Sequence, residues 1–93
     1  MKMFTDRGLN NPDLLGFVAA ENTNQLAKWG IQTRTPFEWL TYTVEELGEL
    51  AQAISEYCYR GGQSKAVIDE AIQVATLALK IAEMFLEEGE EDV

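Results

Sequence analysis

The stretch of sequence that decides the fold is residues 35–58, TPFEWLTYTVEELGELAQAISEYC. Thr35 can accept a hydrogen bond from the backbone N–H of Glu38, the Glu38 side chain can reach back to Thr35, and Pro36 suits the first helical position. The apolar residues that follow recur in alternating steps of three and four, the period of a helix face that packs against another element. They are Phe37, Leu40, Val44, Leu47, Ala51, Ile54 and Cys58. The stretch therefore predicts a long helix, which Gly61-Gly62 ends.

One further helix is expected before this one and another after it. The first begins at Asn11-Pro12, where asparagine can cap and proline is favoured, and it stops near Gly30. The third begins after Gly61-Gly62, with Ser64 as its cap, and carries two apolar stripes. One stripe is Val67, Ala71, Val74, Ala78, Ile81 and Phe85, and the other is Ile68, Ile72, Ala75, Leu79, Ala82 and Leu86. A helix that is apolar on two sides must be covered on two sides.

These signals predict an all-α protein, a helical bundle with two long antiparallel helices and a shorter N-terminal helix. One short helix cannot cover both stripes of the third helix, so we expect oligomerisation to complete the core. We expect a single domain over residues 1–93, with a structured core over residues 11–87. The acidic tail, residues 87–93, is expected to be a frayed and solvated end because like charges in a block repel.

The composition narrows the possible functions. The chain has 93 residues, a formal net charge of −9, no histidine and one cysteine, Cys58. The lack of histidine excludes Ser-His-Asp and Cys-His catalytic arrangements and imidazole ligands for zinc. Carboxylates are then the main groups available for catalysis or metal binding. The scattered lysines and arginines form no basic stripe, so we expect no duplex nucleic acid as a partner. We expect a cytoplasmic protein without a membrane span, since the sequence has no long apolar run and no secretory signal.

Three acids lie close together in the middle of the predicted second helix: Glu45, Glu46 and Glu49. Residues three and four apart share a helix face, so these carboxylates are neighbours that repel one another. Gly48 lies between them and costs about 1 kcal/mol relative to alanine in a helix interior. A divalent cation bound to the carboxylates would offset these costs.

A second acidic position lies on the predicted third helix. Glu70 occupies the stripe of Val67 and Val74, which is otherwise apolar, and Gln73 lies one turn further on. Antiparallel packing across the short Gly-Gly connection can bring Glu70 and Gln73 towards Glu46 and Glu49. Three carboxylates and one amide oxygen suit magnesium or manganese and do not suit zinc. The alternative is that all these acids form an ordinary solvated helix face.

The ordered set of motifs resembles the MazG-like all-α nucleoside triphosphate pyrophosphohydrolases. Glu45-Glu46-x-x-Glu49, followed on the next helix by Glu70-x-x-Gln73, is similar to the Glu-Glu-x-x-Glu … Glu-x-x-Asp signature of that family. Residues 25–32, QLAKWGIQ, are similar to a Lys-Trp-Gly-x-Gln segment that some members carry ahead of the acidic helix. The resemblance spans about residues 20–85.

The resemblance implies a four-helix core assembled by dimerisation, sometimes paired again into a tetramer. It also implies magnesium-dependent cleavage of nucleoside triphosphates between the α and β phosphates, with the monophosphate and pyrophosphate as products. Glu46, Glu49 and Glu70 correspond to metal ligands, and Glu45 corresponds to a residue that positions or deprotonates the attacking water. The family's fourth ligand is usually Asp, whereas this chain has Gln73, which brings no charge and is expected to lower metal affinity.

Further residues are candidates for contacts with a nucleotide. Lys28, Arg60 and Lys65 lie near predicted helix ends and can hold the outer phosphates, although each can equally be a solvated surface charge. Trp29 and Trp39 can stack on a base or pack in the core. Asn22 and Gln25 can read a base edge.

Two functions are therefore compatible with the sequence. The first is a metal-dependent nucleoside triphosphate pyrophosphohydrolase that uses Mg²⁺ or Mn²⁺ and acts as a homodimer or tetramer. The second is a non-catalytic helical module that binds nucleotide or regulates a partner with the same fold. The intact Glu45, Glu46, Glu49 and Glu70 favour the first, and Gln73 favours the second.

Overall fold

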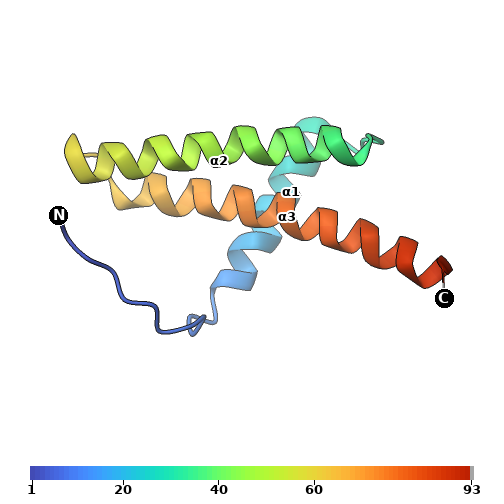
Figure 1. The fold of residues 1–93 in the computed structure, drawn as a ribbon, viewed down its shortest axis with the longest axis horizontal. Coiled ribbons are helices and arrows are strands. Elements are labelled where there is room, and N and C mark those ends of the chain that lie inside the picture. Colours follow the sequence, from blue (N-terminus) through green and yellow to red (C-terminus); the bar gives the residue numbers. More distant parts are fainter. Residues whose placement is uncertain (93) are drawn as a thin grey trace.

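The computed structural model describes the backbone of residues 1–92 and the side chains of residues 1–89. Three helices follow one another along the chain, α1 (Leu14–Trp29), α2 (Pro36–Tyr59) and α3 (Ser64–Asp92). Residues 1–92 contain no strand, which confirms the all-α class. The helices α2 and α3 run antiparallel along their length, and α1 crosses α3 at a steep angle (Figure 1). In the described part of the chain, α1 contacts α3 and not α2.

The predicted start of α2 and the glycines after α1 and α2 are confirmed. The Glu38 backbone N–H donates to Thr35 Oγ1 at 3.2 Å, and the Thr35 backbone N–H donates to Glu38 Oε1 at 3.1 Å. Gly30 and Gly61 have φ angles of 70° and 71°, in the left-handed region that glycine adopts without a Cβ penalty. These three local signals fix where α2 begins and where α1 and α2 end.

The other two helix starts differ from the prediction. The helix α1 begins at Leu14, because the Asn11 side chain accepts from the Asp13 backbone N–H at 2.8 Å and so forms a turn before the helix. The helix α3 begins at Ser64 itself, and the Ala66 N–H donates to the Gln63 carbonyl at 3.2 Å. Asn11 and Ser64 are therefore not the caps that the sequence suggested.

The acidic tail is helical where a frayed end was expected. The helix α3 continues to Asp92, with Glu87 and Glu88 exposed as predicted. Glutamate is a good helix former, and exposed side chains on successive turns keep their charges in water. The expected tail also includes Val93, which lies outside the described residues.

The apolar stripe of α2 is largely exposed, whereas the simplest interpretation of its period places it against α3. We call Phe37, Leu40, Val44, Leu47, Ala51, Ile54 and Cys58 the α2 apolar face. Leu40, Val44 and Leu47 are 51%, 56% and 51% exposed. A different side of α2, with Glu46 and the buried Ala53, packs on α3. Helical period identifies a stripe, but it does not identify the element that covers it.

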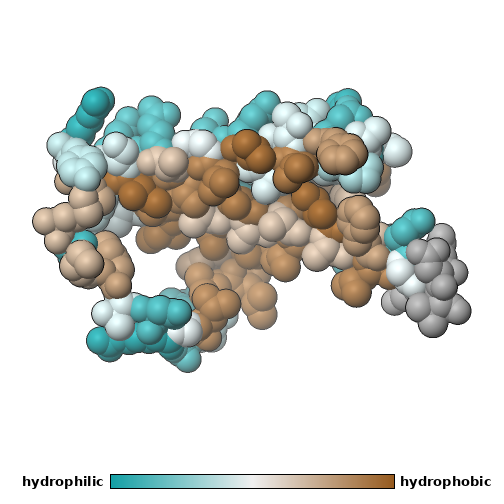
Figure 2. Space-filling model, viewed as in Figure 1, coloured by the Kyte–Doolittle hydropathy of each residue, from teal (hydrophilic) through white to brown (hydrophobic). Residues whose placement is uncertain are grey.

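The second apolar stripe of α3 is also open in part, with Ile68 and Leu79 half exposed. Figure 2 shows apolar residues along both long helices on one face of the molecule. Among the described side chains, the buried apolar ones are Ala53 and Leu77. The protomer therefore has a small core and a large uncovered apolar surface. None of the three helices, within residues 1–92, combines the length and apolar character needed to cross a membrane.

Candidate metal centre

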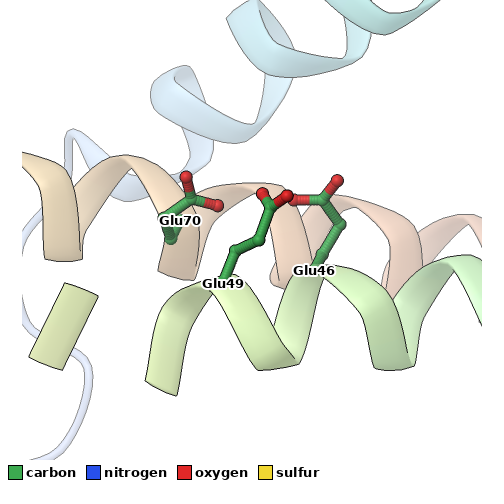
Figure 3. Close-up of side chains that lie close together, drawn as sticks. All are labelled: Glu46, Glu49 and Glu70. Atoms are coloured by element: carbon green, nitrogen blue, oxygen red, sulfur yellow. The ribbon is translucent and has the colours of Figure 1, made fainter. Parts of the chain in front are cut away.

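The packing of α2 on α3 brings three carboxylates together. Glu46 and Glu49 lie one turn apart on α2, and the antiparallel α3 presents Glu70 to them (Figure 3). One carboxylate oxygen from each residue lies within 4.8 Å of the oxygens from the other two. The predicted convergence of these three acids is confirmed.

Two of these carboxylates have an oxygen that is buried and unpaired. Glu46 Oε2 and Glu70 Oε2 are shielded from solvent and have no hydrogen-bond partner among the described residues. Buried polar atoms nearly always find a partner, because desolvation without one is costly. A bound ligand at this point would supply the missing partner for both oxygens.

The electrostatics of the cluster favour protonation or a cation. Burial, together with the negative charges of Glu49 and Glu70, raises the pKa of Glu46 to about 7. Burial also raises the pKa of Glu70, with a further contribution from the charge of Glu49. The charge of Glu49 thus makes it harder for Glu46 and Glu70 to ionise, and a divalent cation would remove this conflict.

The donor set fits a hard divalent cation. Three carboxylate oxygens from two rigid helices are the ligands that magnesium and manganese prefer, whereas structural zinc prefers sulfur and imidazole nitrogen. A Cβ at Gly48 would meet nothing within 4 Å among the described residues, so no other element of the described chain approaches this glycine closely. Glycine at this position is not required by the packing of α2 on α3.

Gln73 and Glu45 line two different cavities. Gln73, one turn after Glu70 on α3, lines a groove of about 550 Å³ between α1 and α3, together with Glu21 and Asn24. Glu45 is exposed and lines a second cavity next to Glu46. The prediction that Gln73 is a fourth ligand remains a prediction.

The second cavity is lined by aromatic rings and touches the acidic cluster. Its volume is about 230 Å³. We call it the ring pocket, and its walls are Trp29, Gln32, Trp39, Tyr42, Glu45, Glu46 and Leu77. The Trp39 and Tyr42 rings meet edge to face, with centroids 6.0 Å apart and an interplanar angle of 73°. Planar walls beside Glu46 suit a flat aromatic ligand that reaches the carboxylates.

The remaining predicted nucleotide contacts are dispersed. Lys28 Nζ lies 4.9 Å from the centroid of the Trp29 ring. Lys65 pairs with Asp69 at 2.6 Å and lines the α1–α3 groove with Gln73. Arg60 is exposed where α2 ends, and Asn22 is half-buried on α1. The structure brings Trp29 and Trp39 to the ring pocket, and it does not gather the three cations at one point.

Gln25 has a different environment from the expected one. Its side chain is 4% exposed, its amide nitrogen donates to Glu21 Oε2 at 2.8 Å, and its amide oxygen accepts from Lys80 Nζ at 2.6 Å. Both ends of the amide are therefore engaged within the protein. Burial lowers the pKa of Lys80, although the charge of Glu21 acts in the opposite direction.

Sequence reasoning missed Lys80, Tyr42 and Gln32. Lys80 interrupts the apolar run of residues 74–86, a signal that its ammonium has a specific partner. Tyr42 lies four residues before Glu46 on the same helix face, so its place beside the cluster follows from helical period. Gln32 follows α1 in a loop and carries no such signal.

The chain matches no protein-family model, no curated protein sequence and no solved structure.

Proposed function

We propose that the protein is a metal-dependent nucleoside triphosphate pyrophosphohydrolase. The observation that carries the proposal is the convergence of Glu46, Glu49 and Glu70, two of them with buried unpaired oxygens, directly beside the ring pocket. A carboxylate cluster without histidine suits phosphate chemistry through a hard cation. The ring pocket provides a place for a nucleobase at the edge of the same cluster.

Each residue has a defined part in the proposed reaction. Glu46, Glu49 and Glu70 hold Mg²⁺ or Mn²⁺, with Gln73 as the fourth ligand. When bound, the cation neutralises phosphate charge and polarises the attacking water. The water oxygen bonds to the α phosphorus, the bond from that phosphorus to the bridging oxygen breaks, and pyrophosphate leaves. The exposed Glu45 carboxylate, which adjoins Glu46, positions this water and accepts its proton.

The base is held by the ring pocket in this proposal. Trp29 and Trp39 offer aromatic faces for stacking, which contributes about 1–3 kcal/mol per base in single-strand binding proteins. The side-chain amide of Gln32 can donate to and accept from a base edge. The cations Lys28, Arg60 and Lys65 are the available partners for the outer phosphates.

The functional unit in this proposal is a homodimer or a dimer of dimers in the cytoplasm. A second copy would cover the α2 apolar face, of which Phe37 and Val44 are 79% and 56% exposed. Glu46, Glu49 and Glu70 are not part of that face, so dimerisation on it would bury apolar residues and no metal ligand.

The test is a product analysis with eight ribo- and deoxyribonucleoside triphosphates and either Mg²⁺ or Mn²⁺. We expect a nucleoside monophosphate and pyrophosphate, loss of turnover in Glu49→Gln and in EDTA, and full turnover in the matched control Glu83→Gln, which changes an exposed acid on α3. A diphosphate and inorganic phosphate as products would contradict the proposed bond cleavage. Nucleotide binding without turnover would establish the non-catalytic alternative.

A further inference from the structure

The contact between α1 and α3 contains one chain of polar side chains. Lys80 Nζ on α3 donates to Gln25 Oε1 at 2.6 Å, and Gln25 Nε2 donates to Glu21 Oε2 at 2.8 Å. Within the described residues, the Lys80–Gln25 bond is the one side-chain hydrogen bond that joins two helices. The backbone of α1 packs on α3 and does not approach that of α2, so its position depends mainly on the contact with α3.

This bond restricts where α1 can sit along α3. Gln25 is 4% exposed and Lys80 is half-buried, so a shift of α1 by one turn would leave an ammonium and an amide without partners. Few apolar residues of α1 oppose such a shift. Leu14 and Val18 are half-buried, whereas Leu15, Phe17 and Leu26 are 78%, 45% and 44% exposed. The directional hydrogen bond therefore selects the register.

The register of α1 decides where Trp29 lies. Trp29 is one turn beyond Gln25 on the same face of α1, and Leu77 is one turn before Lys80 on the same side of α3. Both Trp29 and Leu77 line the ring pocket beside Glu46. The Lys80–Gln25 bond thus lies one turn from two walls of that pocket, which are contributed by two different helices.

We propose that Lys80 is a positioning residue that, through Gln25, holds α1 in the register that places Trp29 in the wall of the ring pocket. Gln25 then serves the site indirectly, with its amide directed to Lys80 and Glu21 and not to a base. The role in substrate binding rests on the proposed function. The role in placing Trp29 does not, and the two can be tested separately.

The first test is NMR spectroscopy of the free, full-length protein. Nuclear Overhauser effects between the Trp29 indole and the Leu77 methyl groups are expected in the wild type. They are expected to persist in Lys80→Arg, which can still donate to Gln25, and to disappear in Lys80→Met. The matched control is Lys65→Met, because Lys65 lies on the same helix and its bond is to Asp69 on that helix. Retention of the contacts in Lys80→Met, or their absence from the wild type, would overturn the proposal.

A second variant covers the case in which Lys80→Met fails to fold. Lys80→Met combined with Gln25→Met replaces both polar partners, which removes the cost of an unpaired buried group. The double variant is expected to be helical by circular dichroism and to lack the Trp29–Leu77 contacts. A folded double variant that keeps these contacts would show that the polar bond does not set the register.

The second test measures binding of an α,β-methylene nucleoside triphosphate with Mn²⁺. Loss of one stacking wall is expected to weaken binding about tenfold in Lys80→Met and to leave Lys80→Arg near the wild type. Unchanged affinity in Lys80→Met would contradict the role in substrate binding. No binding to the wild type would refute the proposed function, while the NMR contacts would still decide whether Lys80 positions Trp29.

Discussion

The ionisation of Glu46 makes the free energy of unfolding depend on pH. Burial and the charges of Glu49 and Glu70 raise its pKa from 4.5 to about 7. Between these values the folded protein binds more protons than the unfolded chain, so the free energy of unfolding falls as pH rises through this window. The stabilisation is complete below the unfolded pKa and is lost above the folded one.

We therefore predict that, in EDTA, the wild type is more stable at pH 5 than at pH 7.5. Solvent screening reduces the difference that is due to Glu46 to about 1 kcal/mol. Saturating Mn²⁺ should reduce the pH dependence, because the cation binds the ionised carboxylates and stabilises the folded state by mass action. Thermal unfolding followed by circular dichroism at both pH values, with and without the cation, measures both effects.

The comparison variant for this prediction is Glu46→Gln. It should be less dependent on pH than the wild type, whereas Glu83→Gln, which removes an exposed acid, should keep the dependence. Equal slopes in the wild type and Glu46→Gln would show that the cluster does not control stability in this range.

At the scale of the elements, α2 depends on its N-terminal capping box. The reciprocal hydrogen bonds of Thr35 and Glu38 satisfy two backbone N–H groups that a helix start otherwise leaves without partners. We predict that Thr35→Ala lowers the free energy of unfolding by about 1 kcal/mol. The corresponding fall in Tm is about 4–8 °C for a domain of this size. Differential scanning calorimetry measures it, and Thr35→Ser, which keeps the hydroxyl, should remain near the wild type.

The positions that sequence reasoning located well are those that depend on local chemistry. The Thr35–Glu38 cap, the stops at Gly30 and Gly61, and the meeting of Glu46 and Glu49 with Glu70 all follow from helical period and one short connection. Convergence of the acids was predictable because a short connection forces the two helices to pack antiparallel.

Features that depend on relations between elements were not predictable in the same way. The spacing of Leu40 and Val44 correctly predicted a helix. Both residues are nevertheless exposed, because α2 packs on α3 through the side that carries Glu46. The sequence suggested that the Gln25 amide is free to bind a ligand, but in the structure it accepts a hydrogen bond from Lys80, fifty-five residues further along the chain. Asn11 and Ser64 are suitable caps by type, yet the backbone around each directs the helix start elsewhere. Long-range packing decided the exposure of the α2 apolar face and the environment of Gln25, whereas local hydrogen bonds decided the two helix starts.

The whole protomer is more extended than a chain of its mass usually is. It exposes 7563 Å², whereas a compact monomer of 10.4 kDa exposes about 5,400 Å². Its radius of gyration is 15.3 Å, against about 12 Å for a compact domain of 93 residues. The α2 apolar face and the open stripe of α3 supply apolar surface for an interface. These values support the proposal that a second copy completes the core.

We predict a dimer or tetramer at micromolar concentration, measured by light scattering. Leu40→Lys places a charge in the α2 apolar face and should shift the population towards monomer, because a buried unpaired charge is costly. Gln52→Lys is the matched control, since Gln52 is exposed on α2 outside that face and should leave the assembly intact. A well-folded wild-type monomer of 10.4 kDa would contradict the prediction.

The central claim is that Glu46, Glu49 and Glu70 bind one divalent cation, and manganese titration followed by electron paramagnetic resonance tests it most directly. We predict saturable binding to the wild type, weaker by about tenfold or more in Glu49→Gln, which removes one charged ligand. Gln73→Asp should bind more tightly because it adds a charged oxygen one turn from Glu70, and Glu83→Gln should match the wild type. If the wild type, Glu49→Gln and Gln73→Asp bind manganese equally, or if none binds it, the three carboxylates are not a metal centre.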